Sequence, residues 1–129
     1  MKKILIIDDT PMTAYFFEHI YFTQVKAQYL QILDPYKARE VIDEFKPGLV
    51  ILDVKFHLPI DGVELGMFIK KEYGIPIIYH SSCTSQEAMD IIDKIKPLGY
   101  MTKAVGNYSE ESKLYYYSLV SYAFKDNLE

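Results

Sequence analysis

Three aspartates stand directly after short aliphatic runs, and their type and spacing could do chemistry. Asp8 and Asp9 follow residues 4–7, and Asp53 follows residues 49–52. Carboxylates held close together repel one another, and at neutral pH such a group needs a cation. Oxygen ligands without a cluster of His or Cys favour Mg²⁺, which keeps some of its water and binds through one or two carboxylates and phosphate oxygens.

A hydroxyl group and an ammonium group follow two later aliphatic runs. Ser81 comes shortly after residues 76–79, and Lys103 comes shortly after residues 98–101. A nucleophilic carboxylate, a divalent metal, a lysine that offsets charge and a hydroxyl donor together suit transfer of a phosphoryl group onto an aspartate. This chemistry requires all of these groups to meet at one place.

Two alternating patterns of apolar residues indicate the strands and helices that would bring these groups together. The aliphatic runs are continuous rather than alternating, which is typical of strands buried on both faces of a parallel sheet. Between them, apolar residues recur at helical spacing. Strand and helix alternate five times, which predicts a (βα)5 flavodoxin-like fold: a doubly wound, parallel five-stranded sheet in a three-layer α/β sandwich. In such a sheet, functional groups gather beyond the carboxyl ends of the strands. The predicted strands are residues 4–7, 29–33, 49–52, 76–79 and 98–101.

The first helix is expected to begin at Thr10 and Pro11. A threonine side chain can cap free helix amides, and proline suits the first helical position because no donor is needed there. Phe16 and Ile20 would then face the core.

Length and composition narrow the class of protein. The 129 residues favour one domain, residues 1–129, either standing alone or forming part of a longer protein. A formal net charge of −4 argues against direct binding of nucleic acid. The single cysteine, Cys83, excludes an intramolecular disulfide framework and a multi-cysteine zinc site. Because no apolar run approaches the ~20 residues that span a bilayer, we expect a soluble, cytoplasmic protein without a membrane partner.

Five short motifs occur in an order and at spacings that are specific only in combination. They resemble the response-regulator receiver domain of two-component signalling, the family of the chemotaxis response regulator, and the resemblance extends from Lys3 to about Phe124. The motifs are IIDD at 6–9, VILD at 50–53, DGVEL at 61–65, IPII at 75–78 and GYMTK at 99–103.

The resemblance implies a role for each residue of the phosphorylation pocket. Asp53 would be the phosphoacceptor, and Asp8 and Asp9 would hold Mg²⁺, Asp9 more directly. Lys55 would offer its backbone carbonyl to the metal. Lys103 would contact the phosphoryl oxygens.

The resemblance also implies a switch and its partners. Ser81 would be the switch hydroxyl, because it stands five residues after Pro76, and Tyr100 would be the aromatic residue that rotates inward when Ser81 is drawn toward the phosphoryl group. The donor would be a sensor histidine kinase or a phosphotransfer protein. The surface of the fourth helix, fifth strand and last helix would then change its partners. Such a domain is a phosphorylated regulator that assists its own phosphorylation and dephosphorylation, and it is not an enzyme.

The chain departs from the family at the rim of the pocket. Ala104 follows Lys103, where the family usually has a proline, and Lys55, Cys83 and Ser82 flank the predicted pocket. In the family, flanking side chains influence how fast the phosphoryl group is lost to water. His80, next to the switch position, is interpreted as a packed or pocket-lining histidine.

Two other functions remain open. A degenerate receiver would act as a constitutive protein-interaction module, which Ala104 favours and the intact acidic set opposes. A Mg²⁺-dependent phosphatase would need a second aspartate where Lys55 stands. An FMN carrier is disfavoured because Asp8 and Asp9 would repel the phosphate, and a P-loop NTPase is excluded because no GK[ST] segment is present.

Tyrosine is unusually frequent in the predicted last helix. Tyr115, Tyr116 and Tyr117 are consecutive, and Tyr122 follows. Neighbouring residues of a helix point about 100° apart, so three consecutive tyrosines cannot all be core. We expect at least one to face solvent, where a partner docks or two copies of the chain meet as a homodimer.

Overall fold

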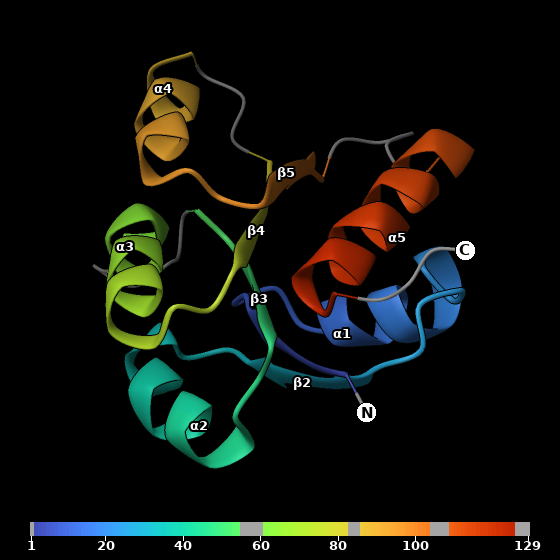
Figure 1. Ribbon diagram of the computed structural model, residues 1–129, viewed down its shortest axis with the longest axis horizontal. Coiled ribbons are helices and arrows are strands. Elements are labelled where there is room, and N and C mark those ends of the chain that lie inside the picture. The colour runs from blue at the N-terminus through green and yellow to red at the C-terminus, as the bar shows by residue number, and fades with distance from the viewer. Residues whose placement is uncertain (1, 55–60, 83–85, 104–108, 126–129) are drawn as a thin grey trace.

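The computed structural model describes residues 2–54, 61–82, 86–103 and 109–125. Five parallel strands form one sheet in the order β2-β1-β3-β4-β5, with helices on both faces (Figure 1). The predicted fold is therefore confirmed, and the predicted strands agree with the observed ones to within two residues at each end. The strands are β1 (Lys3–Ile7), β2 (Gln28–Ile32), β3 (Leu49–Leu52), β4 (Ile77–Ser81) and β5 (Gly99–Thr102).

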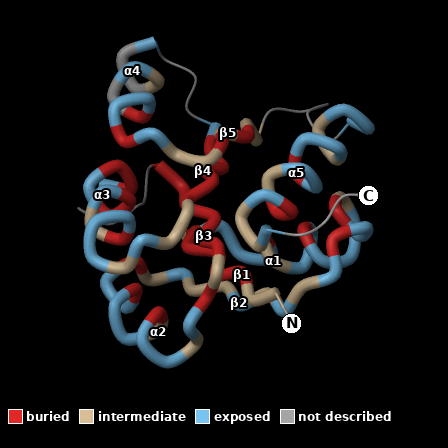
Figure 2. The backbone as a smooth tube through the Cα atoms, in the orientation of Figure 1, coloured by how far each residue is buried: buried red, intermediate tan, exposed pale blue. Residues whose placement is uncertain are grey.

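The two faces of the sheet carry separate cores. On one face, alternate strand residues such as Leu5 and Leu52 pack against α2, α3 and α4. On the other face, Ile4 and Ile51 pack against an aromatic group from the first helical region and α5. Buried residues accordingly concentrate along the central strands (Figure 2). The helices are α1 (Thr13–Phe16), α2 (Ala38–Phe45), α3 (Gly62–Tyr73), α4 (Gln86–Ile95) and α5 (Glu110–Ala123), with short helical segments η1 (Phe17–Tyr21) and η2 (Pro35–Lys37).

The prediction for the first helix is wrong in both its start and its inward face. The helix begins at Thr13, after Met12 in the left-handed region, and it continues as the π-helical segment η1. Phe16 and Ile20 are exposed, at 38% and 46%, whereas Phe17 is buried. The inward face of this helical region is instead formed by Thr13 and Phe17, which stand four residues apart and are both buried.

The tyrosines of α5 divide as expected from helical geometry. Tyr116 is fully buried, and its hydroxyl lies 2.8 Å from the hydroxyl of Tyr29 in β2. Tyr115, Tyr117 and Tyr122 are exposed, which confirms that at least one of the consecutive tyrosines faces solvent.

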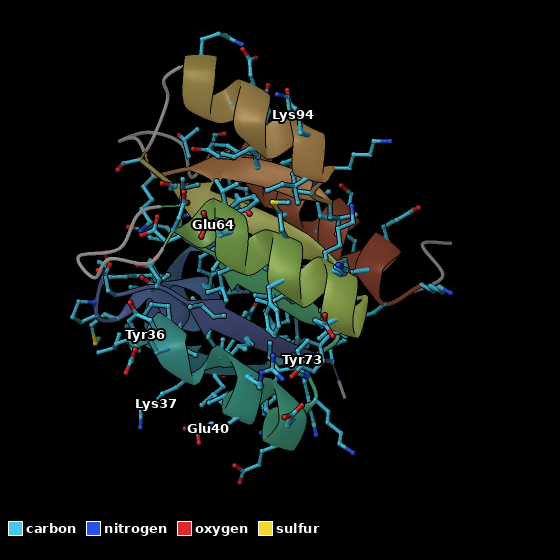
Figure 3. All side chains as sticks on the ribbon, turned by 90° about the vertical axis from the view of Figure 1, so that its left-hand side faces the viewer. Tyr36, Lys37, Glu40, Glu64, Tyr73 and Lys94 are labelled. Carbon is cyan, nitrogen blue, oxygen red and sulfur yellow. The ribbon has the colours of Figure 1, made fainter. Side chains whose placement is uncertain are left out.

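The outer side of the layer formed by α2, α3 and α4 carries charged and polar residues (Figure 3). Glu64 and Lys94 are exposed there, and Tyr73 at the end of α3 donates a hydrogen bond of 2.9 Å to Asp43 of α2. Within the described ranges, none of these helices has the length and apolar character that crossing a bilayer requires.

Candidate functional site

Three carboxylates meet at the carboxyl ends of β1 and β3. Asp8, Asp9 and Asp53 each offer an oxygen, and these oxygens lie within 4.8 Å of one another. The cluster is formed because β1 and β3 are parallel neighbours in register, with Ile7 opposite Leu52, so that both strands end at the same level. Asp8 and Asp53 are buried, at 1% and 7% exposure, while Asp9 is partly exposed.

Lys103, just beyond the end of β5, directs its ammonium group into this cluster. Its Nζ lies 2.7 Å from Oδ2 of Asp8 and 3.2 Å from Oδ2 of Asp53. Burial lowers the pKa of Lys103, but hydrogen bonds and charge from Asp8 and then Asp53 outweigh burial and raise it. The lysine therefore remains a cation held by both carboxylates.

The environment of Asp53 disfavours its negative charge. Burial raises the pKa of the Asp53 carboxyl above its usual value; Lys103 lowers it, and the charge of Asp8 raises it again. A hydrogen bond with the Ser81 side chain lowers it slightly. On the strand side, Oδ1 of Asp53 accepts a 2.8 Å hydrogen bond from the amide of Val54, which fixes the orientation of the carboxylate.

The predicted switch residues lie where the topology requires. Ser81 ends β4, is 2% exposed, and contacts Asp53 through the hydrogen bond above. Ser82, by contrast, is exposed. Tyr100 in β5 is half-buried and packs against the core on the α2–α4 side of the sheet. The structure thus brings Ser81 to the acidic cluster and places Tyr100 on the neighbouring strand.

His80 is a packed residue, as interpreted from the sequence. It is 4% exposed, and its ring meets that of Phe17 edge to face, with the ring centroids 5.0 Å apart. Burial lowers the pKa of His80 to about 4; nearby Lys103 also lowers it, and Asp8 opposes them. The histidine is therefore neutral at physiological pH and packs beside the acidic site.

Sequence reasoning missed several groups that hold the acidic residues in place. Thr13 places its hydroxyl 3.4 Å from Oδ2 of Asp8, and the amide of Thr10 donates to Oδ1 of Asp8 at 2.9 Å. Behind Asp53, Gly62 begins α3 and its amide donates to the carbonyl of Val54 at 2.8 Å. The only signal in the sequence was the Asp61-Gly62 pair at a helix start.

Three predicted residues cannot be placed. Lys55, Cys83 and Ala104 lie outside the described residues, so the predictions about the metal-binding carbonyl, the pocket rim and the missing proline stay as predictions.

The donor set fits a hard divalent cation. Three carboxylates and one ammonium leave the described part of the cluster with excess negative charge. Every candidate ligand atom in it is an oxygen, the ligand that Mg²⁺ prefers. Asp9 is the most exposed of the three aspartates, so its carboxylate is the one most open to solvent.

Comparison with known proteins supports the fold. No family model matches the chain. Over 87 residues it is 26% identical to a protein-glutamate methylesterase/protein-glutamine glutaminase of Vibrio vulnificus, a match that covers 67% of this chain and 25% of that protein. The chain thus spans about a quarter of the length of this curated relative.

Solved structures agree over nearly the whole chain. A two-component response regulator from Clostridium difficile superposes with a TM-score of 0.78 at 18% identity, over 97% of each chain. The activated N-terminal receiver domain of RstA from Klebsiella pneumoniae gives 0.76 at 22% identity, over 92% and 97%. A chemotaxis protein of Vibrio cholerae gives 0.74 at 20% identity, over 93% and 98%. The chain has the fold of the response-regulator receiver domains.

Proposed function

We propose that this chain is a phosphorylation-dependent signalling switch that accepts a phosphoryl group on Asp53 in a Mg²⁺-dependent reaction. The observation that supports it most directly is the joint position of Asp8, Asp9, Asp53 and Lys103 at one edge of the sheet. The donor is a sensor histidine kinase or a phosphotransfer protein, and the reaction takes place in the cytoplasm. The chain acts as one receiver domain, by itself or as part of a longer protein.

The roles of the chain's own groups follow from their chemistry. Asp8 and Asp9 hold the metal, and Mg²⁺ supplies positive charge that offsets the phosphoryl oxygens. A carboxylate oxygen of Asp53 forms a bond to phosphorus as the bond from phosphorus to the donor histidine breaks. Lys103 holds its ammonium group beside Oδ2 of Asp53, where its positive charge also offsets the negative charge of the phosphoryl oxygens. Ser81 provides a hydroxyl that can donate to the transferred group.

The output in this proposal is a changed surface on α4, β5 and α5. Ser81 and Thr102 are register partners in β4 and β5, so a movement of Ser81 acts on the strand that carries Tyr100. Two exposed tyrosines of α5 lie on this surface, Tyr115 beside Gly99 of β5 and Tyr122 beside residues 96–98, and they give it a site where an output partner or a second copy docks. The chain is thus a regulator rather than an enzyme that acts on other molecules.

Phosphorylation by a small-molecule donor tests the proposal without a known kinase. Purified chain is incubated with acetyl phosphate with and without Mg²⁺, and intact mass is measured. Wild type should gain one phosphoryl group only with Mg²⁺, and Asp53→Asn should gain none. Asp93→Asn is the matched control at an exposed aspartate of α4 and should behave as wild type. An unmodified wild type would instead favour the constitutive interaction module.

A further inference from the structure

Tyr79 places a polar group inside an otherwise apolar core. It stands in β4 after Ile77 and Ile78 and is fully buried on the α2–α4 side of the sheet. Its hydroxyl donates a 3.1 Å hydrogen bond to the carbonyl oxygen of Gly62, the first residue of α3. A buried tyrosine hydroxyl usually has a hydrogen-bond partner, because leaving it without one is costly. This bond therefore fixes the distance between β4 and the start of α3.

The start of α3 in turn rests on the backbone of the candidate phosphoacceptor. The amide of Gly62 donates to the carbonyl of Val54 at 2.8 Å. A Cβ atom added at Gly62 would collide with the carbonyl oxygens of Asp53 and Val54. Asp61 caps the helix by accepting a 2.8 Å bond from the amide of Val63. The first turn of α3 therefore lies directly against residues 53–54.

Gly66 leaves the space that the Tyr79 hydroxyl occupies. It lies one turn after Gly62 on the same side of α3, and a Cβ atom there would collide with Oη of Tyr79. Burial raises the pKa of Tyr79 far above its ordinary value of 10, so the hydroxyl remains a neutral donor. Contacts on both sides thus confine this hydroxyl to the carbonyl of Gly62.

We propose that Tyr79 is a positioning residue for the acidic site, acting through α3. By holding the carbonyl of Gly62, it keeps the first turn of α3 against Asp53 and Val54. The amide of Val54 then keeps its bond to Oδ1 of Asp53, and the carboxylate keeps the orientation that the metal site requires. The part that concerns Mg²⁺ rests on the function proposed above.

The test compares Tyr79→Phe with a hydroxyl removed elsewhere. Tyr116→Phe is the matched control, because it also removes a buried, hydrogen-bonded hydroxyl, but in the other core. Amide hydrogen exchange of Gly62 and Val63 is followed by NMR in metal-free protein, relative to amides of β1 and β3. In Tyr79→Phe both amides should exchange about fivefold faster relative to the strands, the factor that corresponds to one ordinary hydrogen bond. In Tyr116→Phe the ratio should not change.

Mg²⁺ titration by calorimetry supplies the second readout. Tyr79→Phe should raise the Mg²⁺ dissociation constant about two- to fivefold, and Tyr116→Phe should leave it unchanged. Equal acceleration of exchange in all amides would show that Tyr79 contributes only general stability. Faster exchange at Gly62 and Val63 without a loss of Mg²⁺ affinity would show that the position of α3 does not affect the acidic site. Either result overturns the proposal. A wild type that binds no Mg²⁺ would overturn the proposed function, while hydrogen exchange would still decide whether Tyr79 positions α3.

Discussion

The ammonium nitrogen of Lys103 lies 2.7 Å from Oδ2 of Asp8, closer than to Oδ2 of Asp53 at 3.2 Å. Lys103 therefore serves as a counter-ion of both carboxylates. A divalent ion that enters the cluster shares the same oxygens, so lysine and metal are expected to compete for charge compensation.

Replacing Lys103 with methionine should make the protein depend more on Mg²⁺. Two buried carboxylates lose their cation in this variant. The free energy of unfolding, measured without Mg²⁺, should therefore fall by about 2–4 kcal/mol. Mg²⁺ should then raise the unfolding temperature more in Lys103→Met than in wild type, measured by thermal unfolding with and without the ion. Lys94→Met, at an exposed lysine of α4, is the control and should show the wild-type shift. Equal shifts in wild type and Lys103→Met would refute the competition.

Asp9→Asn should separate metal binding from folding. Asp9 is partly exposed, whereas Asp8 and Asp53 are buried. Losing one anionic ligand should weaken Mg²⁺ binding at least about tenfold, as measured by calorimetry. The unfolding midpoint in urea should shift little, because Asn keeps the shape of the side chain. Unchanged Mg²⁺ affinity would place the ion elsewhere.

The carboxyl ends of the strands could be predicted from sequence because parallel strands end at one edge. Continuous aliphatic runs marked β1, β3 and β4 to within two residues, and this was enough to bring Asp8, Asp53 and Ser81 together. Lys103 followed from the same rule applied to β5. The rule that parallel strands end at one edge was enough to place these side chains.

The first helix could not be predicted because its cap comes from a distant residue. The helix begins only at Thr13, with Met12 at its N-cap and no side-chain cap from that residue, so the capping expected from Thr10 does not form. The amide of Ala14 is instead satisfied by Oε1 of Gln31 at 2.8 Å, and Nε2 of Gln31 donates to the carbonyls of Asp8 and Thr10. These bonds connect residues far apart in the sequence, and local propensity contains no sign of them.

Buried His80 should make the protein lose stability in mild acid. Its pKa in the folded protein is lowered from 6.5 to about 4, so below pH 6.5 the unfolded chain takes up a proton that the folded chain does not. The stability is complete above pH 6.5 and is lost as the pH falls toward 4. Of the charged groups that act on the imidazole, Lys103 adds to this loss and Asp8 opposes it.

The variant His80→Leu isolates this contribution. Between pH 7 and pH 4.5, wild type should lose roughly 2–3 kcal/mol more of its unfolding free energy than His80→Leu, measured by urea denaturation. His19→Leu removes an exposed imidazole and keeps the buried one, so it should retain the wild-type acid loss. Parallel pH curves for wild type and His80→Leu would show that the imidazole does not resist protonation in the fold.

Gly66 and Tyr79 should be strongly coupled in a double-mutant cycle. An alanine in the interior of an unobstructed helix is about 1 kcal/mol more favourable than glycine, but here the added methyl group collides with Oη of Tyr79. Gly66→Ala should therefore destabilise wild type by about 1–3 kcal/mol, the usual cost of overpacking.

In the Tyr79→Phe background the colliding oxygen is gone, and the nearest remaining atoms lie 3.1 Å and 3.3 Å away. The same substitution should then cost much less, with a coupling energy of at least about 1 kcal/mol from urea denaturation. Additive effects would mean that α3 moves to accommodate the methyl group, and the hydroxyl of Tyr79 would then not confine the helix.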